Sequence, residues 1–175
     1  KHIKITHGGE CMELWDAYNL DGTLAGFDLI RGQKIPVDFL HMVCEAVIQH
    51  DDGDYLLMQR SYNKETYPGK WEIGAGGCAL KGESKIEAVL REIKEETGID
   101  TGELKEIYNI IHPKHQVIYY GFLLKTAFKK EAVQVQENET IDYKWISKNE
   151  LFRFYDKDCS PTLKERLKDY MDSIR

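Results

Sequence analysis

The sequence predicts a single mixed α/β domain over residues 1–175. Short apolar runs between turn residues such as Asp51-Asp52-Gly53 indicate strands. A capping signal at Ser84 begins an amphipathic segment, and a Ser-Pro pair at Ser160 begins a second segment that closes the chain, so both are expected to be helices. With 42% apolar and 31% charged residues, the composition is that of an ordinary globular domain with its own core.

The predicted elements follow one another along the whole chain. Residues 14–18 and 27–31 form a hairpin around Asp21-Gly22, within an N-terminal extension that covers residues 1–36. Gly74, Gly76 and Gly77 interrupt the chain just before the helix at 84–97. The other strands are expected at 41–49, 55–60, 71–73, 104–111, 117–127 and 142–146, and the last helices at 148–153 and 160–174.

Charge and cysteine usage narrow the class of protein. The net charge is −6 and no block of basic residues occurs, which argues against binding a nucleic-acid polymer. Four cysteines without a C-x-x-C pair indicate free thiols, so we expect a cytoplasmic protein. No run of eighteen apolar residues occurs, so no membrane association is expected.

The helix at 84–97 carries two stripes with different chemistry. Ser84 and Glu87 form a capping box, and Gly98 ends the helix. One arc of about 100° is apolar and is expected to pack against the sheet; it holds Ile86, Val89, Leu90 and Ile93. A second arc is acidic and holds Glu92, Glu95 and Glu96.

Such a cluster of acids has two interpretations. Like charges one turn apart repel by about 0.2–0.5 kcal/mol per pair, and a solvated acidic face tolerates that cost. Alternatively, the carboxylates bind Mg²⁺ or Mn²⁺, which prefer oxygen ligands and would cancel the repulsion. Arg91 has Glu87 one turn before it and Glu95 one turn after it, and we expect it to brace both. Spacing alone leaves both interpretations open.

The surrounding residues resemble a known family. Gly77, Glu83 and the run Arg91-Glu92-Ile93-Lys94-Glu95-Glu96-Thr97-Gly98-Ile99 match the Nudix hydrolase signature G-x5-E-x7-R-E-U-x-E-E-x-G-U, where U is apolar. The resemblance extends over about residues 39–152. It implies a Nudix-like α/β/α sandwich around a mixed β-sheet, with a loop and helix at 76–99 that form the Nudix box and an N-terminal β-hairpin extension.

The resemblance also implies an activity and its residues. Family members cleave a phosphoanhydride bond in a diphosphate linked to another group, often a nucleoside diphosphate derivative, by attack of water on phosphorus with Mg²⁺ or Mn²⁺ as cofactor. Carried over, the metal ligands are Glu92, Glu95, Glu96 and the backbone carbonyl of Gly76. Glu95 is the expected general base, Arg91 orients the glutamates, and Glu83 ties the loop to the helix. Glu139 is a further catalytic residue that binds metal or acts as base, with a solvated loop acid as the alternative.

Substrate contacts are expected from the segment before the box. Arg60 and Lys64 flank a polar loop and are candidates for binding the diphosphate, with solvated surface residues as the alternative. Trp71 is a candidate wall of the substrate cleft, with the hydrophobic core as the alternative. The expected partner is a small-molecule diphosphate, and a homodimer stays open because dimers are common in the family.

Two other functions compete with hydrolysis. The N-terminal segment resembles the isopentenyl diphosphate isomerase-like branch, in which a cysteine on the strand entering the box protonates an alkene. Here the matching position is Gly76, and the thiol of Cys78 lies two residues later. Some Nudix domains are ligand sensors without catalysis, usually with damaged boxes and a DNA-binding domain. The intact box favours the hydrolase over both alternatives.

Overall fold

The computed structural model describes residues 5–7 and 10–175, with side chains from Met12 onward. The strands are β1 Ile5–His7, β2 Glu10–Met12, β3 Leu14–Asn19, β4 Leu24–Ile30, β5 Phe39–His50, β6 Tyr55–Arg60, β7 Trp71–Ile73, β8 Ala75–Cys78, β9 Glu103–His112, β10 Val117–Thr126 and β11 Thr140–Ile146. The helices are α1 Lys85–Thr97, α2 Lys148–Lys157 and α3 Pro161–Ser173, with short 3₁₀ turns at Pro113–His115 and Lys130–Ala132.

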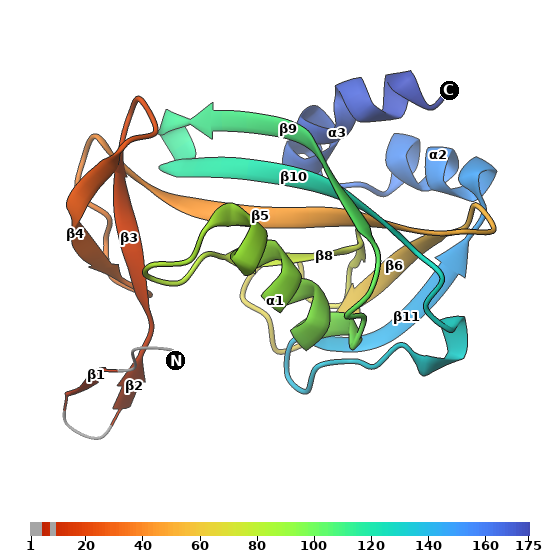
Figure 1. Ribbon diagram of the computed structural model, residues 1–175, viewed down its shortest axis with the longest axis horizontal. Helices are drawn as coiled ribbons and strands as arrows, with labels where there is room; N and C mark the ends of the chain where they lie inside the picture. Colours follow the sequence, from red (N-terminus) through yellow and green to blue (C-terminus); the bar gives the residue numbers. More distant parts are fainter. Residues whose placement is uncertain (1–4, 8–9) are drawn as a thin grey trace.

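A mixed sheet forms the middle layer, and β5 is its central strand (Figure 1). The main path of the sheet runs β11-β6-β5-β10-β9. Along one edge, β5 pairs with β10 in parallel, with Val47 opposite Leu123. Along its other edge, β5 pairs in succession with β3, β8 and β6, all antiparallel. This long strand therefore joins the N-terminal hairpin β3–β4 to the strand that enters the acidic helix.

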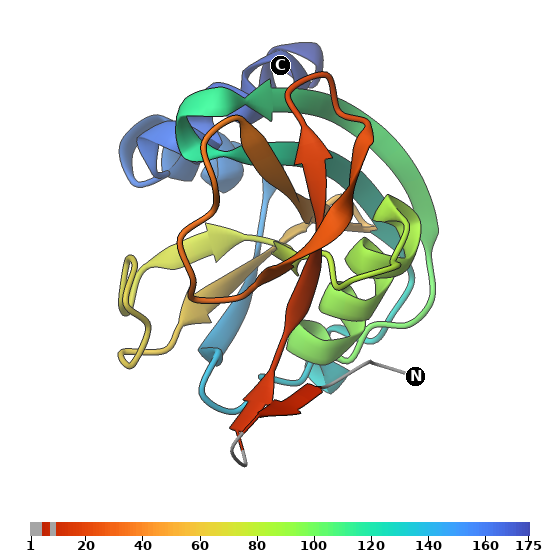
Figure 2. The same ribbon diagram turned by 90° about the vertical axis from the view of Figure 1, so that its left-hand side faces the viewer.

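Helices cover both faces of the sheet, which confirms the predicted α/β/α sandwich (Figures 1 and 2). On one face, Val89 and Ile93 of α1 pack into a core with Cys44 and Phe122. On the other face, α2 and α3 enclose a second core against β5, β6 and β10. Fully or nearly fully buried side chains there include Tyr55, Leu57, Leu151, Leu167 and Met171.

The helix α1 begins and ends where the sequence predicts, but it is turned about its axis relative to the prediction. Ser84 accepts a hydrogen bond from the backbone of Glu87, and the backbone N–H of Gly98 donates to Lys94 at 2.9 Å. Val89 and Ile93 are buried, whereas Ile86 and Leu90 are 42% and 45% exposed. The predicted apolar arc was therefore wrong for these two residues. Ala88 and the acidic side of the helix face inward instead.

The predicted hairpin is present and packs on the loop that leads from β8 to α1. Trp15, Ala17 and Leu29 form a small core, against which Cys78 and Leu80 pack. Two backbone-level contacts fix this placement: the N–H of Lys81 donates to the carbonyl of Leu14, and that of Gly82 donates to Asp16. The sequence did not predict β1, β2 or β8. The hairpin extension is thus docked directly beside the loop between β8 and α1, residues 79–84, which is called the box loop.

Candidate active site

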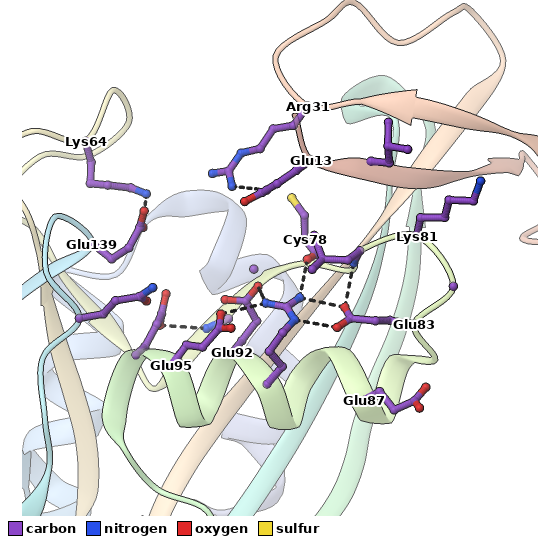
Figure 3. A pocket seen from close by; sticks show the side chains of 18 of the residues that line it. Glu13, Arg31, Lys64, Cys78, Lys81, Glu83, Glu87, Glu92, Glu95 and Glu139 are labelled. Atoms are coloured by element: carbon purple, nitrogen blue, oxygen red, sulfur yellow. Dashed lines mark hydrogen bonds and ion pairs between the residues drawn. The ribbon is translucent and has the colours of Figure 1, made fainter. Parts of the chain in front are cut away.

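A polar cavity of about 620 Å³ lies between α1, the N-terminal hairpin and the loops around β8 (Figure 3). Its lining is dominated by charged side chains. The acids are Glu13, Glu83, Glu87, Glu92, Glu95, Glu96 and Glu139, and the bases are Arg31, Arg60, Lys64, Lys81 and Arg91. Acids along α1 face basic residues on the other walls, so the cavity can hold a cation and an anion together.

Two glycines allow the close approach of β8 to its neighbours. A Cβ added to Gly77 would come within 2.7 Å of Oε2 of Glu92. One added to Gly76 would come within 2.7 Å of the carbonyl oxygen of Cys44 and the Cα of Glu45 on β5. Side chains at either position would push β8 away from its partner strand or from the Glu92 carboxylate. These glycines therefore form part of the site geometry as well as of the sequence motif.

Arg91 organises the acidic wall. Its Nε donates to Oε1 of Glu83 at 2.7 Å, and its Nη2 donates to the carbonyl of Cys78 at 3.0 Å. Its Nη1 donates to Glu92 at 2.7 Å and to Glu95 at 3.1 Å. The expected bracing of Glu87 was wrong, because the Glu87 carboxylate closes the capping box with Ser84.

The Glu83 carboxylate joins the loop to the helix. Its Oε2 accepts from the backbone N–H of Leu80 at 2.8 Å and from Nη2 of Arg91 at 2.9 Å. These contacts tie the segment between β8 and α1 to the middle of α1. The geometry matches the structural role expected for Glu83, and it leaves Glu92, Glu95 and Glu96 as the acids of the wall.

Burial makes the inner carboxylates costly to ionise. Burial, followed by the charge of Glu92, raises the pKa of Glu96 to about 8. Burial likewise raises the pKa of Glu92, although the neighbouring Arg91 opposes this shift. Glu96 accepts a hydrogen bond of 3.3 Å from the backbone N–H of Gly76. A further cation beside these two carboxylates would restore their charged form.

The donor set fits a hard divalent cation. Glu92, Glu95 and Glu96 line the cavity together with Gly76, and carboxylate and carbonyl oxygens are the ligands that Mg²⁺ and Mn²⁺ prefer. Within residues 5–7 and 10–175, no three His, Cys, Asp or Glu side chains are already gathered as a closed metal site. Arg91 holds Glu92 and Glu95 through one oxygen each. Burial disfavours the ionised form of Glu96, and this is the form that a cation beside it would stabilise.

The other predicted residues divide into two groups. Lys64 and Glu139 both line the cavity and form an ion pair with each other on the same wall. Arg60 reaches the lining, but its guanidinium donates to Glu72 at 2.9 Å and to the carbonyl of Thr66 at 2.9 Å, so it holds its own loop together.

Trp71 lies away from this cavity. Its ring packs with the core beneath α2 and α3, and Nζ of Lys144 lies 4.2 Å from the ring centroid. The structure therefore does not bring Trp71 together with the acids of α1; the residue packs on the core and lines a separate cavity of about 180 Å³.

Sequence reasoning missed the contribution of the N-terminal hairpin to the cavity. Arg31 and Glu13 lie on the wall opposite α1, and Lys81 lies on the box loop (Figure 3). The pairing of Leu14 with Ile30 places Glu13 and Arg31 side by side at the open end of the hairpin. The predicted hairpin is enough to place Glu13 beside Arg31. The docking of the hairpin on the box loop, which brings both residues to the cavity, has no local sequence signal.

Comparison with known proteins assigns the family. The family model for the NUDIX domain matches residues 40–167. The chain belongs to the Nudix family. A Nudix hydrolase of Listeria monocytogenes, itself uncharacterized, is 33% identical over 142 residues, which are 80% of this chain and 83% of the relative. The chain is accordingly a Nudix pyrophosphohydrolase, and enzymes of this family generally use divalent metal ions.

Solved structures agree with the Nudix fold. The DR0079 protein of Deinococcus radiodurans superposes with a TM-score of 0.70 at 19% identity, covering 87% of this chain and 96% of the other. The NUDIX domain of Shewanella oneidensis NrtR, solved with ADP ribose, gives a TM-score of 0.54 at 20% identity, covering 74% and 83%. At these identities the likeness concerns the fold. None of the helices in the described part of the chain is long and apolar enough to span a membrane.

The isomerase branch of the family is a more distant relative. An isopentenyl-diphosphate Delta-isomerase of Salmonella heidelberg is 27% identical over 111 residues, 61% of each chain. Gly76 offers no side chain at the position where that branch is expected to have its cysteine. The Cys78 thiol lines the cavity, and burial raises its pKa to about 11.

Proposed function

We propose that this Nudix hydrolase cleaves the phosphoanhydride bond of a diphosphate linked to another group, a nucleoside diphosphate derivative or a related compound, and that it requires Mg²⁺ or Mn²⁺. The observation that carries the proposal is the Glu92–Glu96 pair. Both carboxylates are held in the cavity wall, where burial disfavours their charged form and so raises the pKa of each. A cation and a polyanionic substrate would together compensate the charges on both sides of the cavity.

The proposed metal ligands are Glu92, Glu95, Glu96 and the carbonyl of Gly76. A bound divalent ion supplies neutralisation of phosphate charge and a lowered pKa for a bound water. Arg91 acts as a positioning residue, because its hydrogen bonds to Glu83 and to the carbonyl of Cys78 fix the guanidinium that orients Glu92 and Glu95.

The proposed general base is Glu95. Its side chain is 43% exposed, more than that of Glu92 at 14%, so a water molecule from the cavity can reach it. Glu139, just before β11, is the proposed further residue that binds metal or acts as base, and Lys64 is its ionic partner. Lys64 is also a proposed ligand of the substrate diphosphate, so substrate binding would release Glu139 from its pairing.

The proposed substrate is defined by its chemical class, a small-molecule diphosphate. The cavity favours a polar, multiply charged ligand over a nucleic-acid polymer or a membrane surface, and we propose a small-molecule diphosphate as substrate and the cytoplasm as the compartment. The ADP ribose bound to the NrtR domain makes ADP ribose a sensible first compound to assay. A homodimer is the proposed assembly, to be checked by size-exclusion chromatography with light scattering.

The test is hydrolysis of a panel of diphosphate compounds by the purified protein with Mg²⁺, with Mn²⁺ and with EDTA. We expect metal-dependent product release that Glu96→Gln abolishes while the protein stays folded. Glu103→Gln, on the exposed start of β9, is the matched control and should retain full activity. Absence of product from the whole panel, or full activity in Glu96→Gln, would contradict the proposal.

The isomerase and sensor alternatives have distinct outcomes in the same experiment. An isomerase would convert isopentenyl diphosphate to dimethylallyl diphosphate, and this conversion would disappear in Cys78→Ala. A sensor would bind ADP ribose or a related compound without cleaving it. Either result would replace the hydrolase assignment of the site.

A further inference from the structure

The side chain of Arg31 lies over the cavity from the wall opposite α1 (Figure 3). Its only close ionic partner in the described residues is Glu13, with Nη1 and Oε2 separated by 2.6 Å. Both side chains stay open to solvent, at 53% exposed for Arg31 and 38% for Glu13. Ion pairs this exposed contribute roughly 0–1 kcal/mol, so a stronger anion can displace Glu13 at little cost.

The backbone holds Arg31 in this place. Its N–H donates to the carbonyl of Glu13 at 3.0 Å, next to the Leu14–Ile30 pair. The N–H of Lys81 donates to Leu14 at 2.8 Å, which anchors the same hairpin to the box loop. Only the Arg31 side chain therefore needs to move to meet a ligand in the cavity.

Three other basic residues of the cavity are more fully engaged, whereas Lys81 is 38% exposed and pairs with the exposed Asp28 but lacks the two-pronged guanidinium of Arg31. The Arg60 side chain is 18% exposed and donates to Glu72 and to its own loop. Arg91 is 13% exposed and is bonded to three glutamates of the acidic wall. Lys64 is 22% exposed and is paired with Glu139. Arg31 combines the most exposed guanidinium of the lining with the weakest type of pairing, and the charge of Glu139 also acts on it across the cavity.

We propose that Arg31 is a substrate-binding residue that exchanges Glu13 for non-bridging oxygens of the substrate diphosphate. A guanidinium can donate two parallel hydrogen bonds to a phosphate. The Arg31–Glu13 ion pair is made through Nη1 of Arg31. The diphosphate then lies between Arg31 and the acids of α1. This inference rests on the proposed function, and it makes the N-terminal extension a part of the substrate site.

The test is the affinity for imidodiphosphate, a diphosphate that is not hydrolysed, measured by calorimetry in the presence of Mg²⁺. Arg31→Ala is expected to raise the Kd about tenfold, the value of a hydrogen bond between charged groups. The matched control is Arg175→Ala, because Arg175 is 51% exposed and pairs with Asp156 on the far side of the sheet. This control is expected to leave the Kd unchanged.

Glu13→Gln gives the second arm, with an effect of opposite sign. Glutamine still accepts a hydrogen bond from Arg31 but no longer competes by charge, so the Kd should fall two- to fivefold, roughly the worth of an exposed ion pair. If the Arg31–Glu13 pair merely held the hairpin in place, both variants would weaken binding or leave it unchanged. Thermal unfolding of each variant shows whether the hairpin remains folded.

Three outcomes overturn the inference. The first is an Arg31→Ala variant that binds like Arg175→Ala, and the second is a Glu13→Gln variant that binds more weakly than the wild type. Both leave the hydrolase function intact if the wild type cleaves the diphosphate panel. The third is a wild type that does not bind imidodiphosphate. If that protein also hydrolyses no compound of the panel, the proposed function fails with it.

Discussion

Replacing Glu96 with glutamine is expected to stabilise the metal-free protein while abolishing hydrolysis. Burial, followed by the charge of Glu92, raises the pKa of Glu96 to about 8. When the pKa of a group is higher in the folded protein than in the unfolded chain, its contribution to the free energy of unfolding depends on pH. The contribution is complete below the unfolded pKa, and it is lost as the pH rises through the folded pKa. Glutamine has nearly the same shape and no charge, so the variant escapes this loss.

The size of the effect follows from proton linkage. From the ordinary pKa of 4.5 up to about 8, the folded protein holds a proton that the unfolded chain releases. Each pH unit in this window lowers the free energy of unfolding by at most about 1.4 kcal/mol. Because Glu96 keeps some access to solvent, we expect an advantage of about 1–2 kcal/mol for Glu96→Gln at pH 7.5 and almost none at pH 5.

Urea unfolding in EDTA at these two pH values measures the difference. Glu95→Gln is the control, because Glu95 is 43% exposed and its substitution removes a charge of α1 without relieving a buried carboxylate. Added Mg²⁺ should stabilise the wild type and not Glu96→Gln, since a ligand of the folded state raises stability by mass action. The reasoning would be refuted if Glu96→Gln were less stable than the wild type at pH 7.5.

Three further substitutions test other parts of the site. Arg91→Lys should lower the free energy of unfolding by about 1–3 kcal/mol in urea, because lysine cannot bridge Glu83 and Glu92 at once; an unchanged midpoint would contradict this. In Gly77→Ala, the new methyl group displaces the Glu92 carboxylate, so kcat should fall at least about tenfold with the thermal midpoint nearly unchanged; wild-type kcat would count against the geometry. Lys64→Ala should raise KM roughly tenfold in steady-state assays, and an unaltered KM would remove Lys64 from the substrate site.

The local elements were predictable because their signals are local. The capping box at Ser84 and the C-terminal glycine Gly98 fix α1 to within a residue. β8 was missed, because Ala75–Cys78 reads as a glycine-rich turn by propensity. Its extended conformation comes from pairing with β5, where the absence of side chains at Gly76 and Gly77 permits close approach. Tertiary pairing overrides the local preference at this point.

The facing of α1 could not be deduced from periodicity. The hydrophobic pattern predicts that Ile86 and Leu90 face the core, yet both are exposed. The helix is turned so that Glu92 and Glu96 face the cavity beside β8, with the small Ala88 fully buried beneath them. Functional carboxylates thus occupy positions that a purely structural helix would give to apolar residues. Local rules fail here because the site, rather than the core, sets the orientation.

The substrate side of the cavity depends on long-range docking. The family signature identifies the acids of α1, but Arg31 and Glu13 reach the cavity only because the N-terminal hairpin packs on Cys78 and Leu80. Nothing in the sequence near Arg31 marks it as part of a site. Variation in such an extension can change specificity while the acidic wall stays the same.

The most direct test of the central claim is the metal dependence of diphosphate hydrolysis. Wild type and Glu96→Gln are incubated with nucleotide sugars, dinucleotides, damaged nucleotides and prenyl diphosphates, and the products are separated by anion-exchange chromatography. We predict product from the wild type with Mg²⁺ or Mn²⁺, none with EDTA, and only background from Glu96→Gln. Turnover that persists in EDTA, or a wild-type rate in Glu96→Gln, would contradict the account that carboxylates of α1 act through a bound cation.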